Sequence, residues 1–471
     1  MKQGLVPELA PKRYLITGRM KRKIDDYLIS WKGRPDRKPL MVRGARQVGK
    51  TYSIEQFAGL NYRHLLKVNL EQERNIHSAF ESLRPEQIIN ELSALYQIPV
   101  EDEHTLLFID EIQACPKAIA TLRYFYEDRP GLHIICAGSL LDHTLNEIQY
   151  TMPVGRLDFA YMYPLSFSEF LMAAGEKGLV GYINDFSPGG QFSMAVHKRL
   201  LEMLRLYFFI GGMPEAVDYY IKTRDLSGID RIHSALITSI EYDFAKYGSR
   251  KQQEHLRDVL QYVANNIGKK VKYVNVNRNV PSGLLKDAFL KLEMSRIIHL
   301  VRHTRSADVP LSGMQDNDVF KPVFFDIGIL IHIAGIRLMD INDPISAFEG
   351  ALAEQFVFQE LMSCGVPYKE QKLFYWIREA KNSNSEIDCL YQIGNKVYPI
   401  EIKAGKRGTL KSLHVFLAEK NKTTGIRFNT DVPSVGEDLK AKVNLQGKED
   451  LTYNLISLPL YVAGNLDGMT I

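Results

Sequence analysis

The stretch at positions 44–51 constrains the fold of this chain more than any other. It has the phosphate-loop pattern Gly-x-x-x-x-Gly-Lys-Thr, in full Gly44, Ala45, Arg46, Gln47, Val48, Gly49, Lys50 and Thr51. Glycine allows the backbone angles that turn successive N–H groups toward phosphate oxygens. The Lys50 ammonium would reach the β- and γ-phosphates, and the Thr51 hydroxyl would bind Mg²⁺. The pattern therefore predicts a nucleoside-triphosphate site.

The residues around this loop supply the context that it needs, because it works only between a strand and a helix whose amino end faces the anion. Residues 39–42 have the character of a short strand, and residues 52–60 can continue as a helix. Further along, four apolar residues end in Asp110 and Glu111, as expected of a buried parallel strand. Asp110 would hold Mg²⁺ through water, and Glu111 would orient or deprotonate the attacking water.

Strands alternate with helical stretches from position 39 onward. This order predicts an α/β fold with a P-loop AAA-type, doubly wound parallel sheet whose site lies at the strand carboxyl ends. The predicted strand at residues 132–137 leads to Ser139, which would sense the γ-phosphate, cap the next helix, or do both. Arg156 is a candidate arginine finger, because a planar guanidinium neutralises charge on the transferring phosphoryl group. A purely structural arginine is the alternative.

The length of the chain limits its possible domain organisation. A chain of 471 residues is too long for one core and predicts three domains. We place an AAA-type ATPase domain with a basic amino-terminal segment at residues 1–215, a helical and winged-helix-like region at residues 216–310, and a nuclease-like domain at residues 311–471. The basic segment before position 38 would form a helix packed on the ATPase core or an arm that contacts nucleic acid.

Composition also excludes several classes of protein. The hydrophobic share of 45% and charged share of 24% are those of an ordinary globular protein, and a net charge of +4 identifies no partner. The four cysteines are far apart and lack Cys-x-x-Cys spacing, which argues against a disulfide framework or a zinc site. Because no apolar run approaches the roughly 18 residues that span a bilayer, we expect a cytoplasmic protein that does not have the membrane as a partner.

The middle of the chain is predicted to be mostly helical. A turn at residues 211–215 interrupts the helices. Between positions 255 and 305 the order is helix, short extended piece, helix and strand, which suits a winged helix. This part is basic, as a DNA-contacting module needs; its cations are Lys269, Lys270, Lys272, Arg278, Lys286, Lys291, Arg296, Arg302 and Arg305. An inert spacer between domains is the alternative.

A second group of charged residues lies in the predicted third domain. Asp388 is on the first strand of a predicted hairpin, and Glu401 and Lys403 are on its second strand, two residues apart and therefore on one face. With Glu354 from the preceding helix, the carboxylates would bind Mg²⁺ or Mn²⁺, and Lys403 would activate water or stabilise the pentavalent transition state. A solvent-facing hairpin with a salt bridge is the alternative. The order of elements favours a restriction-endonuclease-like α/β domain.

Several motifs together carry a resemblance to a known family. They are residues 44–51, 107–113, 163–167, 211–215, 325–330, Gly350 with Glu354, and residues 388–403. On these motifs, nearly the full chain resembles a widespread prokaryotic family of uncharacterised AAA-type ATPases. In that family an AAA domain precedes a C-terminal domain of unknown function that looks like the PD-(D/E)XK nuclease fold. Residues 270–281 lack the polar strand-turn-helix of a recognition module, which argues against sequence-specific DNA reading but not against backbone contact.

The resemblance implies ATP as the nucleotide and ATP hydrolysis as the reaction, with Mg²⁺. The family's motif positions fall on Gly49, Lys50, Thr51, Asp110 and Glu111, and the match favours Ser139 as sensor and Arg156 as finger. The principal hypothesis is an ATPase that regulates a nuclease-like C-terminal domain, with DNA as a candidate partner. Two alternatives stay open: a nucleotide-dependent switch with a non-catalytic binding module, and a metal-dependent nuclease with a structural ATPase. A finger acting in trans would require a homo-oligomer.

Overall fold

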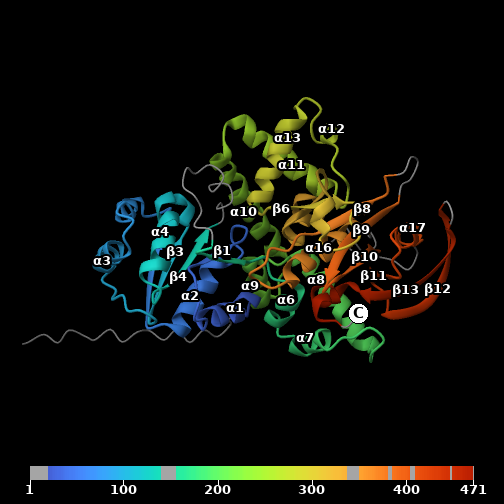
Figure 1. Cartoon of the computed structure of the whole chain (residues 1–471), viewed down its shortest axis with the longest axis horizontal. Coiled ribbons are helices and arrows are strands. Elements are labelled where there is room, and N and C mark those ends of the chain that lie inside the picture. Colours follow the sequence, from blue (N-terminus) through green and yellow to red (C-terminus); the bar gives the residue numbers. More distant parts are fainter. Residues whose placement is uncertain are drawn as a thin grey trace, which may run out of the picture.

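A computed structural model of the chain describes residues 20–138, 155–336, 350–379, 385–403, 409–445 and 448–469. Two β-sheets lie at opposite sides of the molecule (Figure 1), with the first in blue to cyan and the second in yellow to red. Helices from the middle of the chain, in green to yellow, lie between and above the two sheets (Figure 1). The predicted α/β class is confirmed.

The first sheet has five parallel strands in the order β2-β3-β4-β1-β5. Its strands are β1 Leu40–Arg43, β2 His64–Asn69, β3 Thr105–Asp110, β4 His133–Gly138 and β5 Asp158–Tyr161. The helices and turns among them are α1 Lys23–Lys32, α2 Lys50–Asn61, η1 Arg74–Phe80, α3 Pro85–Tyr96, η2 Ile112–Ala114 and α4 Pro116–Asp128. The predicted parallel sheet is confirmed, whereas strand β5 was not predicted.

Both faces of this sheet are covered, as buried parallel strands require. Leu40 and Val42 of β1 face one core, together with α1 and α2, while Met41 faces a second core with α3 and α4. Trp31 and Leu28 of α1 have no exposed surface. Over residues 23–32, the basic amino-terminal segment therefore forms a helix that packs on the first sheet, which is the first of the two predicted alternatives. Residues 1–19 lie outside the described residues.

Helices continue the first of these cores toward the second sheet. They are α6 Phe167–Ala173, α7 Lys177–Asn184, α8 Met194–Ile210, α9 Pro214–Thr223, α10 Ser227–Asp243, η3 Phe244–Tyr247 and α11 Arg250–Asn265. One cluster of buried side chains includes Leu40 of β1, Leu204 of α8 and Phe356 of the C-terminal region. The predicted parts of the chain therefore share one apolar core. The turn at residues 211–213 separates α8 from α9, as predicted.

Some of the elements predicted between positions 255 and 305 are present, but the winged helix itself stays a prediction. Helices α12 Tyr273–Val276 and α13 Ser282–Met294 precede an antiparallel pair of strands, β6 Ile298–Thr304 and β7 Gln315–Phe324, separated by η4 Leu311–Met314. The prediction of an extended piece at residues 271–276 is wrong, because this piece contains α12. Strand β6 also pairs with β8 of the second sheet, so the hairpin is not a free wing and the sheet crosses the predicted boundary at position 310.

The second sheet has the order β12-β13-β11-β10-β9-β8-β6-β7. Its remaining strands are β8 Phe374–Ile377, β9 Glu386–Ile393, β10 Lys396–Ile402, β11 Thr424–Asn429, β12 Ser434–Leu445 and β13 Lys448–Pro459. Its helices and turns are α14 Ile327–Ile333, α16 Ala351–Cys364, α17 Lys411–Glu419 and η6 Leu460–Gly468. Strands β9 and β10 form the predicted antiparallel hairpin, and β11 runs parallel to β10 after α17. None of the described helices is both long and apolar enough to cross a bilayer.

Because of a buried carboxyl group on α16, we expect the stability of the folded chain to depend on pH. Glu360 is 1% exposed, and its Oε1 accepts a 2.9 Å hydrogen bond from the backbone N–H of Phe167. Burial raises the pKa of Glu360 from 4.5 to about 8. Between these two pKa values the folded chain keeps a proton on Glu360 that the unfolded chain has lost. The contribution of protonated Glu360 to the free energy of unfolding is therefore complete below pH 4.5 and is lost as the pH rises through 8.

We therefore expect the wild type to lose free energy of unfolding relative to Glu360→Gln by about 1.4 kcal/mol per pH unit near pH 6–7.5. Urea unfolding of both proteins across this range measures the difference. Glutamine keeps the acceptor for Phe167 but does not titrate. Parallel pH profiles for the two proteins would contradict a proton on Glu360.

Candidate functional site

The phosphate loop connects the carboxyl end of β1 to the amino end of α2, as predicted. Gly49 caps α2 with φ of +95°, a left-handed conformation that side chains other than glycine rarely adopt. A Cβ atom at Gly44 would lie 2.2 Å from the carbonyl oxygen of Met162. Both glycines are therefore required by the backbone itself, because one sets the turn and the other allows the close approach of a neighbouring strand.

Lys50 is held within the loop. It is 7% exposed, and its ammonium donates to the carbonyl oxygens of Gly44 at 3.0 Å and Ala45 at 2.8 Å. Burial lowers the pKa of Lys50 to about 8, against the opposing effect of Glu111 and Asp110. The ammonium is thus desolvated in advance, and the charge of a bound phosphate would stabilise it.

The predicted magnesium ligands face each other across two elements. The Thr51 hydroxyl, at the start of α2, donates a 2.9 Å hydrogen bond to Oδ2 of Asp110, at the end of β3. Burial raises the pKa of Asp110, and the hydrogen bond from Thr51 opposes this rise. Hydroxyl and carboxylate oxygens are the hard donors that Mg²⁺ prefers. These two residues therefore fit the ion, whose other ligands would be phosphate and water oxygens.

Glu111 lies directly after β3 in a left-handed backbone conformation, with φ of +49°. Its Oε2 accepts a 2.5 Å hydrogen bond from the Gln113 side chain. Glu111 and Lys50 line the same cavity, and the Glu111 charge raises the pKa of Lys50 against the effect of burial. Gln113 was not predicted as a site residue, but its side chain contacts Glu111 through this hydrogen bond.

A cavity of about 770 Å³ opens over the phosphate loop. It is lined by Met20, Arg22, Arg46, Gln47, Gly49, Lys50, Thr51, Tyr52, Ser53, Glu111, Pro214, Glu215, Asp218 and Lys222. Its size is within the usual range of ligand pockets, about 300–1,000 Å³. The four residues from α9 were not predicted as site residues. The turn at residues 211–215 was the signal for them, because it places the amino end of α9 beside the loop.

Arg22 was also missed. It is 6% exposed, and its guanidinium donates to the carbonyl oxygens of Val48 at 3.0 Å and Tyr163 at 2.7 Å. Its Nε also pairs with Glu169 at 3.1 Å. Arg22 therefore joins the phosphate loop to the segment between β5 and α6. The basic composition of the amino-terminal segment did not distinguish this arginine from its neighbours.

The phosphate loop is linked to the helical region by charged side chains. Arg46 forms an ion pair with Asp243 at the end of α10. Lys246 pairs with the same carboxylate at 3.3 Å and with Glu71, after β2, at 2.5 Å. A predicted loop residue therefore contacts the last residue of a long helix outside the first sheet.

The two remaining residues predicted for this site have different outcomes. Arg156 pairs with Glu127 at 3.0 Å and lies over the ring of Tyr126, both on α4. It precedes β5, which runs parallel to β1, so it lies at the edge of the sheet opposite the phosphate loop. The structure therefore does not bring Arg156 to the nucleotide site of its own chain. Ser139 lies outside the described residues, and its role as sensor or cap stays a prediction.

The residues predicted for the C-terminal site lie close together. The Lys403 ammonium pairs with Oε1 of Glu401 at 2.7 Å, and Asp388 accepts a 2.8 Å hydrogen bond from the backbone N–H of Ile402. Glu354 faces the same group from α16. Burial, followed by the charge of Asp388, raises the pKa of Glu354 to about 8 and that of Glu401 to about 7.

Two further charged residues belong to this group and were not predicted. Lys321 of β7 is 1% exposed, and its Nζ lies 3.7 Å from Oε2 of Glu354. It also forms an ion pair with Glu386 of β9. In the part of the chain that the structure describes, no three His, Cys, Asp or Glu side chains are grouped so as to hold a metal ion. The metal predicted for Glu354, Asp388 and Glu401 thus gains no support from the geometry.

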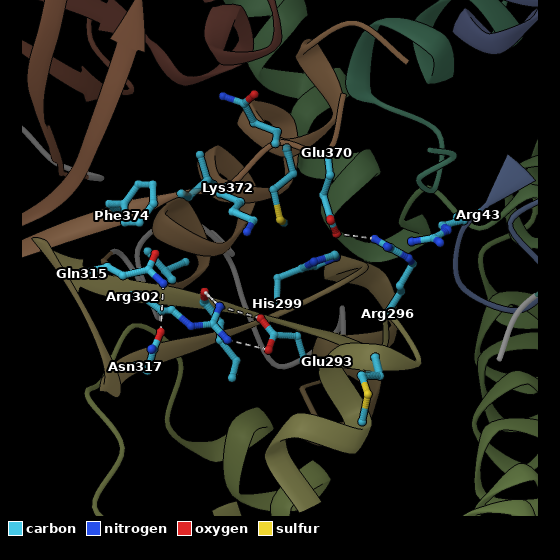
Figure 2. Close-up of a pocket in the computed structure, with 16 residues that line it drawn as sticks. Arg43, Glu293, Arg296, His299, Arg302, Gln315, Asn317, Glu370, Lys372 and Phe374 are labelled. Atoms are coloured by element: carbon cyan, nitrogen blue, oxygen red, sulfur yellow. Dashed lines mark hydrogen bonds and ion pairs between the residues drawn. The ribbon is translucent and has the colours of Figure 1, made fainter. Parts of the chain in front are cut away.

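Another cavity, of about 340 Å³, lies where the first sheet meets β6 and the segment before β8 (Figure 2). Arg296 pairs there with Glu370 at 2.7 Å, and Arg302 pairs with Glu293 through two hydrogen bonds of 2.8 and 2.7 Å. Arg43, the last residue of β1, lines the same cavity. The ion pairs join α13 and the residues around β6 to each other and to the segment before β8. Because Arg43 brings the end of β1 to the same cavity, we interpret the cavity as part of the contact between the sheets.

Three segments of the chain match known families. Residues 36–171 match a family described as an AAA domain. Residues 201–340 and 349–446 match two families described as domains of unknown function, DUF8612 and DUF4143. No curated protein sequence matches the chain significantly.

Solved structures give only distant similarities. The ORC2 protein of Aeropyrum pernix is 12% identical, with 66% of this chain and 90% of that chain covered and a TM-score of 0.31. The RuvB Holliday junction branch migration motor of Thermotoga maritima is 13% identical, with 61% and 89% covered and a TM-score of 0.27. These TM-scores are too low to support an argument. The family matches show that the chain carries an AAA domain followed by regions of unknown function.

Proposed function

We propose that this protein binds ATP with Mg²⁺, hydrolyses it, and uses the nucleotide state to control its C-terminal domain. The observation that carries the proposal is the cavity of about 770 Å³ that Lys50, Thr51 and Glu111 line together. The AAA domain at residues 36–171 agrees with this reaction.

In this proposal the chain supplies position and charge. Lys50 binds the β- and γ-phosphate oxygens and neutralises charge that develops on the transferring phosphoryl group. Glu111, oriented by Gln113, holds the attacking water and accepts its proton. Mg²⁺, when bound by Thr51 and Asp110, supplies further charge neutralisation at the phosphates. Sensing of the γ-phosphate by Ser139 remains part of the proposal.

An arginine finger requires a second copy of the chain. Because Arg156 lies at the sheet edge opposite its own phosphate loop, its guanidinium would have to reach the nucleotide of a neighbouring chain. The proposal therefore includes a homo-oligomer only if Arg156 acts as the arginine finger.

Control of the rest of the chain would pass through Arg46. Its ion pair with Asp243 connects the phosphate loop to α10. A phosphate group in the loop competes with Asp243 for this guanidinium, because both are anions that accept hydrogen bonds from it. ATP binding would thereby release or shift the carboxyl end of α10.

We expect Asp243→Asn to weaken this coupling. In the wild type, ATP should change amide hydrogen exchange in α10 and α11, whereas the variant should show less than half of that change. Its affinity for ATP should not fall, because the variant removes the anion that competes with phosphate for Arg46. Asp185→Asn, an exposed carboxylate after α7, is the matched control. Equal exchange responses in all three proteins would remove Asp243 from the mechanism.

The target of control is the C-terminal domain, for which we propose a nuclease-like fold. The order of α16, the three antiparallel strands β8 to β10, α17 and the parallel strand β11 supports this fold. DNA is the candidate partner, on the basis of the basic residues between positions 269 and 305.

A second candidate function is a nucleotide-dependent switch whose C-terminal domain binds without cleaving. The specific observation that favours it is the buried ammonium of Lys321 among the carboxylates. Plasmid cleavage with Mg²⁺ or Mn²⁺ separates the two candidates. A controlled nuclease should lose cleavage in both Lys50→Ala and Asp388→Ala, whereas a switch should cleave in no variant.

A further inference from the structure

The carboxylate cluster of the C-terminal domain, defined here as Glu354, Glu386, Asp388 and Glu401, already contains a cation. We propose that the ammonium of Lys321 is the resident cation of this cluster and that the cluster takes no divalent metal while Lys321 is in place. This inference does not depend on ATP hydrolysis, because every residue in it lies outside the AAA domain.

The geometry around Lys321 supports this role. Its side chain is 1% exposed, and it extends from β7 over the ring of Tyr375, with Nζ 5.2 Å from the ring centroid. The ammonium then reaches Glu386, with which it pairs, and Glu354, whose Oε2 lies 3.7 Å away. A buried ammonium is costly unless carboxylates compensate it. The charges of Glu354, Asp388 and Glu386 hold the pKa of Lys321 above its ordinary value despite burial.

Two ammonium groups already face the four carboxyl groups of the cluster, because Lys321 pairs with Glu386 and Lys403 pairs with Glu401 at 2.7 Å. They compensate part of the negative charge of the cluster without a metal. A divalent ion would have to approach both ammonium groups against charge repulsion.

Removing the lysine should therefore open a metal site. Glu354 Oε2 and Glu401 Oε2 are buried and accept no hydrogen bond from the described residues. Among the described residues these carboxylates are not grouped for a metal ion as they stand around the ammonium. Without the Lys321 ammonium, only Lys403 would compensate them, and a divalent ion would draw the oxygens of Glu354, Glu401 and Asp388 together. Hard carboxylate oxygens are the ligands that Mn²⁺ and Mg²⁺ prefer.

The test is titration of the full chain with Mn²⁺ alone, followed by electron paramagnetic resonance. All proteins carry Asp110→Asn, so that the AAA domain contributes no carboxylate at its magnesium site. The parent should bind no Mn²⁺ at the cluster, and Lys321→Met should gain one ion per chain with at least tenfold higher affinity. Adding Glu354→Gln to Lys321→Met should abolish the gain, whereas Lys321→Arg should behave as the parent.

Two outcomes overturn the proposal. One is a parent protein that binds Mn²⁺ and loses this binding in Glu354→Gln or Asp388→Asn. The other is a Lys321→Met variant that has the circular dichroism of the parent but gains no Mn²⁺. If Lys321→Met does not fold, the parent and its Glu354→Gln variant are compared instead. Equal Mn²⁺ binding by these two proteins would show that the cluster of the parent binds no metal, as proposed.

Discussion

Lys50→Ala is expected to lower the rate of ATP hydrolysis at least 100-fold, or roughly 2.7 kcal/mol, the typical cost of removing one preorganised charge-stabilising group. The reason is geometric, since the Lys50 ammonium lies inside the loop between the carbonyl oxygens of Gly44 and Ala45. A phosphate bound there has no other lysine within the loop. Release of inorganic phosphate from saturating ATP measures the effect.

The matched control for this experiment is Lys177→Ala, which removes an exposed lysine at the start of α7. It changes the same charge and the same side-chain volume away from the cavity. Hydrolysis within about twofold of wild type is expected. A similar loss in both variants would mean that Lys50 acts through net charge or stability, and a Lys50→Ala variant with full activity would remove it from the reaction.

Asp326→Ala is expected to lower the free energy of unfolding by about 2–6 kcal/mol. Asp326 has no exposed surface, and its carboxylate accepts hydrogen bonds from the N–H groups of Gly212 at 2.6 Å and Ile329 at 3.0 Å. It thereby caps α14 and fixes the turn that carries α9 to the nucleotide cavity. Alanine leaves both donors buried without a partner, and each such donor costs about 1–3 kcal/mol.

Urea unfolding followed by fluorescence measures this loss, with Asp318→Ala as control. The Asp318 side chain is 67% exposed and pairs with Lys286 at the surface, so its removal should cost less than about 1 kcal/mol. The loss of free energy of unfolding in Asp326→Asn should lie between those of the two alanine variants, because an amide still accepts one of the two hydrogen bonds. Equal losses for Asp326→Ala and Asp318→Ala would contradict the structural role assigned to the buried carboxylate.

The parts of the nucleotide site that were predicted are local in sequence. Gly49, Lys50 and Thr51 form a continuous motif whose chemistry restricts it to one backbone conformation, and Asp110 ends an apolar run that only a buried strand explains. Arg22 escaped prediction because its partner Glu169 is 147 residues away. Pro214 and the rest of α9 escaped for the same reason, since tertiary packing brings them to the loop.

In the C-terminal domain, the spacing of Glu401 and Lys403 predicted a shared face, and the 2.7 Å ion pair confirms it. Because side chains alternate between the two faces of a strand, such pairs can be predicted from their spacing in the sequence. Lys321 was not predicted, because β7 reaches the cluster only through the order of strands in the sheet, which no local pattern gives. Strand β5 has four residues, too few for a periodic signal.

The most direct test of the central claim is isothermal titration calorimetry of the wild-type chain with ATP in the presence of Mg²⁺. We predict saturable binding of one ATP per chain, strongly weakened in Lys50→Ala and dependent on Mg²⁺. A folded wild-type protein without saturable ATP binding would contradict the assignment of the cavity over the phosphate loop as a nucleotide site.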